Sequence, residues 1–200
     1  MKILFATKNP AKIRRYVNEL EKRNIEVLTI KDLDISLHVE ESGKDALENA
    51  YIKAKAYYDA TGLTTIAVDD NLYLEELPDD KQPGTHVRRV NGKELTDEEM
   101  ITYYTDLARQ YGGRLNGKWK YGMVIYNGVE TKQYTWEKGD YCIVDKPCEK
   151  RNPGYPLDSI AVSPKYNKYW FDVTEEEKGK GDNEEEVIEF IISNIMAPLR

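Results

Sequence analysis

The amino-terminal part of the chain alternates between strand and helix patterns, and this alternation restricts the possible folds more than any other feature. Lys2–Ala6 is a short apolar run of the kind found in buried strands. Apolar residues then recur at helical spacing from Ile13 to Leu20, and Ile25–Ile30 returns to an extended pattern. A strand, a loop, a helix and a second strand in this order predict an α/β fold.

Further elements downstream extend the same alternation. The pattern predicts a helix from about Lys44 to Ala60, preceded by a capping sequence at Ser42 and Asp45. The β-branched and apolar segment Thr64–Val68 then predicts another strand. These segments belong to the same α/β arrangement as the amino-terminal unit.

The second half of the chain adds two helices and a hairpin. Thr96 and Glu99 are placed to cap a third helix. Residues 118–144 are predicted to form a β-hairpin with a type I′ turn at Asn127-Gly128, and a last helix begins near Glu184. The whole sequence therefore predicts an α/β fold, with a mixed twisted sheet and flanking helices in a single domain over residues 1–200.

Composition and charge argue against several classes of protein. The chain has 200 residues, of which 40% are hydrophobic, enough for one domain with a substantial core. Its net charge of −7 argues against a nucleic-acid binder, although one polyphosphate ligand remains compatible with it. No apolar run approaches the roughly 20 residues of a membrane span, and the amino terminus lacks a signal-peptide pattern. We therefore expect a cytoplasmic protein with no membrane partner.

The loop after the first strand reads Thr7-Lys8-Asn9-Pro10-Ala11-Lys12 and leads into the first helix. Asn9 is a favourable N-cap, and Pro10 is a favourable first helical residue. Lys8 and Lys12 flank this helix N-terminus, where the helix dipole disfavours a cation but favours a phosphate. The pattern therefore indicates an anion site. The alternative is a pair of solvated lysines beside an ordinary helix cap.

Two acidic pairs and a lysine accompany the second predicted helix. Glu40-Glu41 precede this helix, Asp69-Asp70 end the strand that follows it, and Lys53 lies on the helix itself. Ligands of α/β sheets bind beside strand ends, and Mg²⁺ is held by one or two carboxylates plus substrate phosphates. Each acidic pair alone is more typical of a solvated loop. Together with the lysine-flanked loop, however, they suggest metal-dependent polyphosphate chemistry.

Several segments also carry motifs of one enzyme family, in the same order and at fitting spacings. Residues 7–12 look like its T-x-N-x-x-K loop, and residues 41–54 are similar to its E-x-G-x-(T/S)-(F/Y)-x-E-N-A-x-x-K-A segment. Residues 66–77 resemble its A-D-D-S-G-L-x-V-x-x-L segment. Residues 83–92 follow its P-G-x-Y-S-A-R-Y-x-G pattern.

Two later segments complete this series of matches. Residues 153–162 weakly match G-F-G-Y-D-P-I-F, and residues 174–178 match a segment that ends in a late lysine. The chain thus resembles the inosine triphosphate pyrophosphatase family, the noncanonical purine NTP pyrophosphatases. The resemblance implies two lobes around a long central cleft, one of them contributed mainly by residues from about 70 to 150, and usually a homodimer. It also implies Mg²⁺-dependent hydrolysis of a nucleoside triphosphate to the monophosphate and pyrophosphate.

The resemblance assigns roles to individual residues. Asp69 is the expected catalytic carboxylate that positions or deprotonates the attacking water, and Lys12 and Lys53 are expected to assist it beside the phosphates. Glu40 or Glu41, together with Asp69, is expected to bind Mg²⁺. The expected substrate-binding residues are Thr7, Lys8, Asn9, Lys12, Asp70, Arg89, Tyr155, Asp158, Lys178 and Asn183.

The sequence departs from the family pattern at the strand end. In a gapless alignment that keeps Leu72 in register, Asp70 replaces a phosphate-contacting serine. An acid there should repel phosphate unless it recruits another Mg²⁺. In the alternative register, Asp69-Asp70 match the two aspartates of the family motif.

The base-reading segments depart as well. Tyr155 is the aromatic residue left for stacking on a base, and Asp182-Asn183-Glu184 stand where the family has S-H-R. Asn can donate or accept, whereas an ionised Glu only accepts, and an acceptor facing the base favours an exocyclic amine over a carbonyl. We therefore expect an altered base preference. A catalytically weak nucleotide-binding or scaffold protein on the same fold is the alternative function.

Overall fold

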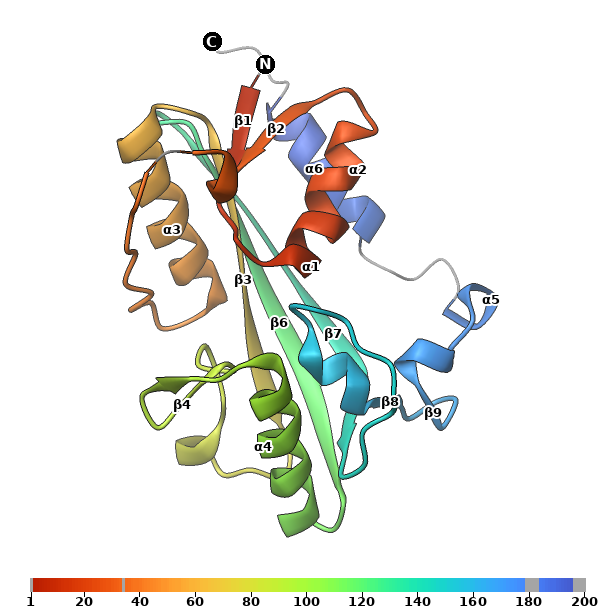
Figure 1. Cartoon of the computed structure of the whole chain (residues 1–200). Coiled ribbons are helices and arrows are strands. Elements are labelled where there is room, and N and C mark those ends of the chain that lie inside the picture. The colour runs from red at the N-terminus through yellow and green to blue at the C-terminus, as the bar shows by residue number, and fades with distance from the viewer. Residues whose placement is uncertain (1, 34, 179–183, 196–200) are drawn as a thin grey trace. The chain divides into compact units, whose positions relative to one another are not determined.

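The computed structural model describes residues 2–33, 35–178 and 184–195, and its elements are labelled in Figure 1. The chain divides into two compact units. Unit 1 comprises Met1–Asp70, Tyr121–Trp136 and Asn183–Arg200. Unit 2 comprises Asn71–Lys120 and Glu137–Asp182.

A mixed seven-stranded sheet runs in the order β2-β1-β3-β6-β7-β8-β9. Strand β1 pairs in parallel with both β2 and β3, whereas β8 pairs antiparallel with β7 and β9. The predicted mixed sheet with flanking helices is therefore confirmed. The strands are β1 (Lys2–Phe5), β2 (Glu26–Thr29), β3 (Thr65–Leu74), β6 (Arg114–Tyr126), β7 (Thr131–Val144), β8 (Ala161–Ser163) and β9 (Lys168–Tyr169), and a second, two-stranded sheet contains β4 (Arg89–Val90) and β5 (Lys93–Glu94).

The helices interleave with these strands along the chain. The first predicted helix consists of α1 (Pro10–Lys12), a π-helical turn (Ile13–Val17) and α2 (Asn18–Glu21). Short 3-10 turns cover Ile30–Asp32, Asp79–Lys81, Pro156–Ile160 and Trp170–Asp172. The remaining helices are α3 (Ala46–Thr61), α4 (Asp97–Gln110), α5 (Glu175–Lys178) and α6 (Glu184–Ile195).

Strand β1 of unit 1 is covered by helices on both faces. Ile3 and Phe5 belong to one buried cluster with side chains of the first helix and α6, whereas Leu4 packs with Ala50 and Ala54 of α3. Figure 1 shows α3 on one side of β1 and β3, and α2 and α6 on the other. Successive strand residues point to opposite faces, so a strand buried on both faces needs a continuous apolar run.

Unit 2 has its own core, formed between α4 and the sheet residues of this unit. Met100, Ile101 and Tyr104 of α4 pack with Leu72 and Leu115 in one buried cluster. The Tyr104 hydroxyl donates to the backbone carbonyl of Val87 at 2.9 Å. Burial raises the pKa of Tyr104, so this phenol stays protonated and available as a donor.

Two local predictions needed correction. Helix α3 is capped by Asp45, whose side chain accepts from the Glu48 backbone N–H, and Ser42 lies before this cap. The connection between β6 and β7 is not a type I′ turn, because only Gly128 of Asn127-Gly128 has a positive φ. Instead, the Asn127 side chain accepts from the backbone N–H groups of Val129 and Glu130. The Asn127 side chain therefore stabilises a different connection from the predicted two-residue turn.

The predicted cap of α4 is present as a capping box, which gives a first testable prediction. Glu99 accepts from the Thr96 N–H, and Thr96 Oγ1 accepts from the Glu99 N–H. We expect Thr96→Ala to lower the free energy of unfolding by about 1 kcal/mol, because it leaves a helix N–H without its partner. Urea denaturation measures this loss. Thr102→Ala, on the same helix but outside the cap, is the matched control.

The contribution of Glu99 should depend on pH. Hydrogen bonds from Lys93 and then from the Thr96 N–H lower the pKa of Glu99 from 4.5 to about 2. A lowered folded-state pKa gives stability that is present above pH 4.5 and is lost as the pH falls toward 2. The difference between wild type and Glu99→Gln should therefore shrink across this window. A difference that stays constant from pH 6 to pH 2 would contradict the ionic part of this cap.

Candidate active site

The loop that follows β1 is held by its own side chains. Asn9 caps α1 by accepting from the Ala11 N–H at 2.8 Å, and Pro10 occupies the first turn. Thr7 Oγ1 accepts from the Asn9 N–H at 3.1 Å. Thr7 is buried, Asn9 is half-buried and Lys8 is exposed. In unit 1, Thr7 and Asn9 therefore shape the loop, and Lys8 projects toward solvent.

Two lysines of unit 1 converge on Asp69 and Asp70 of β3. These two acids were predicted to end the strand, but β3 continues past them to Leu74, so that prediction is wrong. The Lys12 ammonium donates to Asp70 Oδ1 at 2.6 Å and to the Val68 carbonyl at 3.2 Å. The Lys53 ammonium, from α3, lies 2.5 Å from Glu41 Oε1. Each ammonium is also 4.0 Å from Asp69 Oδ1. The structure thus brings together residues of the first helix, the loop before α3, α3 itself and β3.

Asp69 lies between these two lysines. Its side chain is only 12% exposed, and among the described residues its Oδ2 is buried with no hydrogen-bond partner. Burial raises the pKa of Asp69, and the nearby Lys12 and Lys53 act in the opposite direction. An unpaired buried carboxylate oxygen is costly, so its presence marks a position where a ligand atom or a water would be stabilised.

The acidic residues of this cluster can supply only part of the coordination shell of Mg²⁺. Within residues 2–33, 35–178 and 184–195, no group of three or more His, Cys, Asp or Glu side chains is arranged to hold a metal ion. Mg²⁺ commonly takes one or two protein carboxylates and completes its shell with waters and substrate phosphates. The free oxygen of Asp69 and the neighbouring Glu41 suit that arrangement. Glu40 is exposed, whereas Glu41 is the one that contacts Lys53.

Four of the predicted substrate-binding residues, Arg89, Tyr155, Asp158 and Lys178, belong to unit 2. Arg89 is exposed on β4, and Tyr155 is half-buried just before the 3-10 turn Pro156–Ile160. Asp158, in that turn, accepts from the Asn152 amide at 2.7 Å. Lys178 ends α5, but its side chain is outside the described part, and Asn183 lies outside the described residues.

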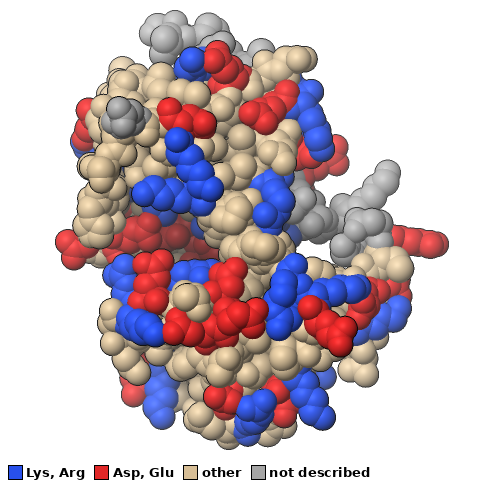
Figure 2. All heavy atoms as spheres, viewed as in Figure 1, with Lys and Arg blue, Asp and Glu red and all other residues tan. Residues whose placement is uncertain are grey.

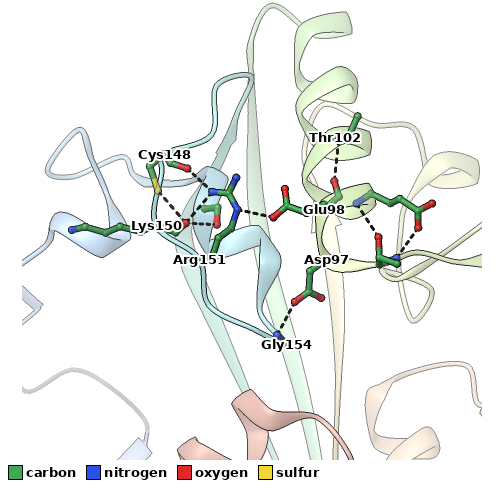
Figure 3. Close-up of polar contacts among 10 residues, drawn as sticks. Asp97, Glu98, Thr102, Cys148, Lys150, Arg151 and Gly154 are labelled. Carbon is green, nitrogen blue, oxygen red and sulfur yellow. Dashed lines mark hydrogen bonds and ion pairs between the residues drawn. The ribbon is translucent and has the colours of Figure 1, made fainter.

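The segment that carries Tyr155 is hydrogen-bonded to the first turn of α4, as Figure 3 shows. Asp97 accepts from the Gly154 N–H at 2.9 Å, and Glu98 accepts from Arg151 Nε at 2.8 Å. Neither of these two acids was singled out from the sequence. Their role was missed because their partners lie more than 50 positions away.

The surface of the described residues mixes charges of both signs. Figure 2 shows acidic and basic side chains next to one another over the viewed face. Many form exposed ion pairs, such as Lys2–Glu26 at 2.8 Å, which contribute little to stability. In the part of the chain that the structure describes, every helix is too short or too polar to cross a membrane.

The lysines and carboxylates gather on β3 beyond the carboxyl end of the neighbouring parallel strand β1, and proteins with α/β sheets commonly bind ligands beside such strand ends. The chain belongs to the Ham1 family, whose model matches residues 3–186. The resemblance noted in the sequence is thereby confirmed. This match covers every segment that builds the cluster in unit 1.

Individual relatives and solved structures agree with this assignment. The chain is 27% identical to a dITP/XTP pyrophosphatase of Leptospira interrogans, covering 95% of this chain and 94% of the relative. It is 32% identical to a dITP/XTP pyrophosphatase of Aquifex aeolicus, covering 90% and 89%. The Ham1 protein of Staphylococcus aureus matches with a TM-score of 0.72 at 24% identity over 98% of both chains. A HAM1 protein from Coxiella burnetii gives a TM-score of 0.72 at 22% identity, covering 99% of this chain and 100% of that one. These two structures support the fold.

Proposed function

We propose that this protein is a Mg²⁺-dependent nucleoside triphosphate pyrophosphatase that acts on noncanonical or modified purine nucleotides. The observation that carries the proposal is the buried Asp69, whose Oδ2 lacks a partner among the described residues and whose Oδ1 faces Lys12 and Lys53. The name dITP/XTP pyrophosphatase borne by relatives over about nine-tenths of the chain supports the choice of substrate class.

The proposed roles follow from the positions of these side chains. Asp69 Oδ2 accepts a hydrogen bond from the attacking water and takes its proton, a task suited to a carboxylate whose pKa is raised by burial. The water oxygen forms a bond to a phosphorus of the α–β anhydride, that anhydride bond breaks, and pyrophosphate leaves. Lys12 and Lys53 offset the charge that grows on the phosphoryl oxygens. Mg²⁺, held by Asp69 and Glu41, would supply Lewis-acid stabilisation of the same charge.

Lys53 offers a test with a matched control on the same helix. We expect Lys53→Met to lower kcat/KM for a triphosphate substrate by roughly 100-fold, because a fixed cation beside the reacting phosphates is lost. Lys55→Met removes a lysine two positions away that pairs with the exposed Asp59, and we expect the activity of this variant to be unchanged. Initial rates of pyrophosphate release measure both. Equal activity of the two variants would contradict the role of Lys53.

One assay distinguishes the proposed pyrophosphatase from the alternative, a nucleotide-binding protein with little catalytic activity. Pyrophosphate release should be measured with Mg²⁺ across standard, oxo-purine, amino-purine and pyrimidine triphosphates. Nucleotide binding without turnover by folded protein would favour the binding protein.

The same assay tests the base preference. We propose that preference for inosine and xanthosine nucleotides is altered, which is supported by Asp182-Asn183-Glu184 in the sequence where the resembled family has S-H-R. Comparable turnover of inosine triphosphate, with no gain for aminopurines, would contradict it.

A further inference from the structure

The ammonium group of Lys12 is already engaged by the protein. Its N–H groups donate to Asp70 Oδ1 at 2.6 Å and to the Val68 carbonyl at 3.2 Å. The side chains of the Lys12–Asp70 pair are only 10% and 22% exposed. Because solvent screens this pair weakly, the attraction between its members is much stronger than in a surface ion pair. A phosphate oxygen that binds Lys12 therefore competes with Asp70.

The charges around Lys12 make this competition unfavourable for a bare polyphosphate. Lys12 and Lys53 supply two positive charges, whereas Glu41, Asp69 and Asp70 are three carboxylates. With all three carboxylates ionised, the cluster carries one net negative charge before any anion arrives. In the gapless alignment, Asp70 also stands where the resembled family carries an uncharged serine, so in this register an internal anion replaces an uncharged side chain.

We propose that Asp70 sets the polyphosphate affinity of this site by holding Lys12 in an ion pair that an incoming phosphate has to open. This inference rests on the proposed function, because it takes Lys12 as a phosphate-binding residue. Asp70 is a positioning residue here, since it acts through Lys12. Its consequence is that a metal-free polyphosphate binds weakly, whereas Mg²⁺ bound to the polyphosphate offsets part of this handicap.

The direct test is calorimetric binding of inorganic tripolyphosphate to the full chain in EDTA, where no hydrolysis step interferes. We expect Asp70→Asn to bind roughly 10- to 100-fold more tightly than wild type, because one carboxylate is lost and the Lys12 ammonium is released. Asp70→Ser should behave in the same way. Asp59→Asn makes the same charge change on α3, at an exposed residue paired with Lys55, and should bind as wild type does.

A double-mutant cycle separates release of Lys12 from a general change in charge. In the Lys12→Met background, the gain caused by Asp70→Asn should become much smaller, because only the loss of one negative charge remains and there is no ammonium left to release. A gain of undiminished size in that background would overturn the proposal. Wild-type or weaker binding by both folded Asp70 variants would overturn it as well, as would the absence of measurable binding to any of these proteins.

The kinetic consequence distinguishes this proposal from the proposed function itself. With a triphosphate substrate, Asp70→Asn should lower KM and reduce the Mg²⁺ concentration needed for half-maximal rate. Hydrolysis by wild type with no change in KM or Mg²⁺ requirement in Asp70→Asn would overturn only the role of Asp70. Tight, Lys12-dependent binding of tripolyphosphate to Asp70→Asn without turnover of any triphosphate by wild type would overturn only the pyrophosphatase activity.

Discussion

Asp69→Asn is expected to reduce kcat for triphosphate hydrolysis by at least about 100-fold. Asparagine keeps the shape of the side chain but has no basic oxygen that can take a proton from the attacking water. It also withdraws one carboxylate from the proposed Mg²⁺ ligands. Pyrophosphate release at saturating Mg²⁺ measures the loss. Asp59→Asn, an exposed acid-to-amide change on α3, is the control that should keep full activity.

The same substitution should not weaken the fold, and this separates catalysis from stability. Burial raises the pKa of Asp69 in the folded protein, so ionisation of Asp69 opposes folding once the pH passes its unfolded value of 3.8. Asp69→Asn removes that cost. Relative to wild type, the variant should therefore gain stability as the pH rises from 3.8 through the raised pKa of Asp69. Urea denaturation at acidic and alkaline pH measures this difference.

Two results would contradict the assignment of Asp69. The first is retention of more than about a tenth of wild-type activity, since removal of a general base costs far more than that. The second is loss of activity together with a lower free energy of unfolding at every pH. That combination would show that Asp69 supports the fold rather than the reaction.

The local elements of the fold could be predicted from the sequence because their signals are local. Strand β1 is predicted by its apolar run, and helix α3 by its helical periodicity. The capping box at Thr96 is predicted by the three-residue spacing between Thr96 and Glu99. The π-helical turn Ile13–Val17 had no such signal. The choice of Asp45 over Ser42 as a cap also depended on where the backbone enters α3.

The candidate site was predictable as a set of residues but not as a set of contacts. In the sequence, Lys12, Lys53 and Asp69 stand out as charged residues next to a helix start, on a helix and after a predicted strand, although β3 in fact continues through Asp69 to Leu74. The pairing of Lys12 with Asp70 joins positions far apart in the chain. From the sequence, Asp70 was expected among the substrate-binding residues, where it would repel phosphate unless it recruited a metal ion. Its contact with Lys12 depends on β3 lying beside β1, which periodicity alone does not specify.

Gly122→Ala should be strongly destabilising, because strand β6 and helix α3 of unit 1 touch through their backbones at this position. A Cβ atom at Gly122 would lie 2.5 Å from both the Cα and the N of Leu47, and 2.7 Å from the carbonyl carbon of Ala46. No side-chain rotation relieves a clash with backbone, so we expect a loss of about 3 kcal/mol in the free energy of unfolding. Urea denaturation measures this loss.

Gly139→Ala is the matched control for that measurement. Gly139 lies in β7, and an added Cβ there would meet nothing within 4 Å, so we expect a neutral or slightly stabilising effect. Equal stability of the two variants would show that α3 can move away from β6 at little cost. If moving α3 is costly, a Gly122→Ala protein can still fold only with α3 displaced, and its free energy of unfolding is then lower. Because Lys53 lies on α3 and reaches Glu41 and Asp69 from it, that shift should also lower activity. Glycine at position 122 therefore contributes both to the stability of unit 1 and to the geometry of the proposed active site.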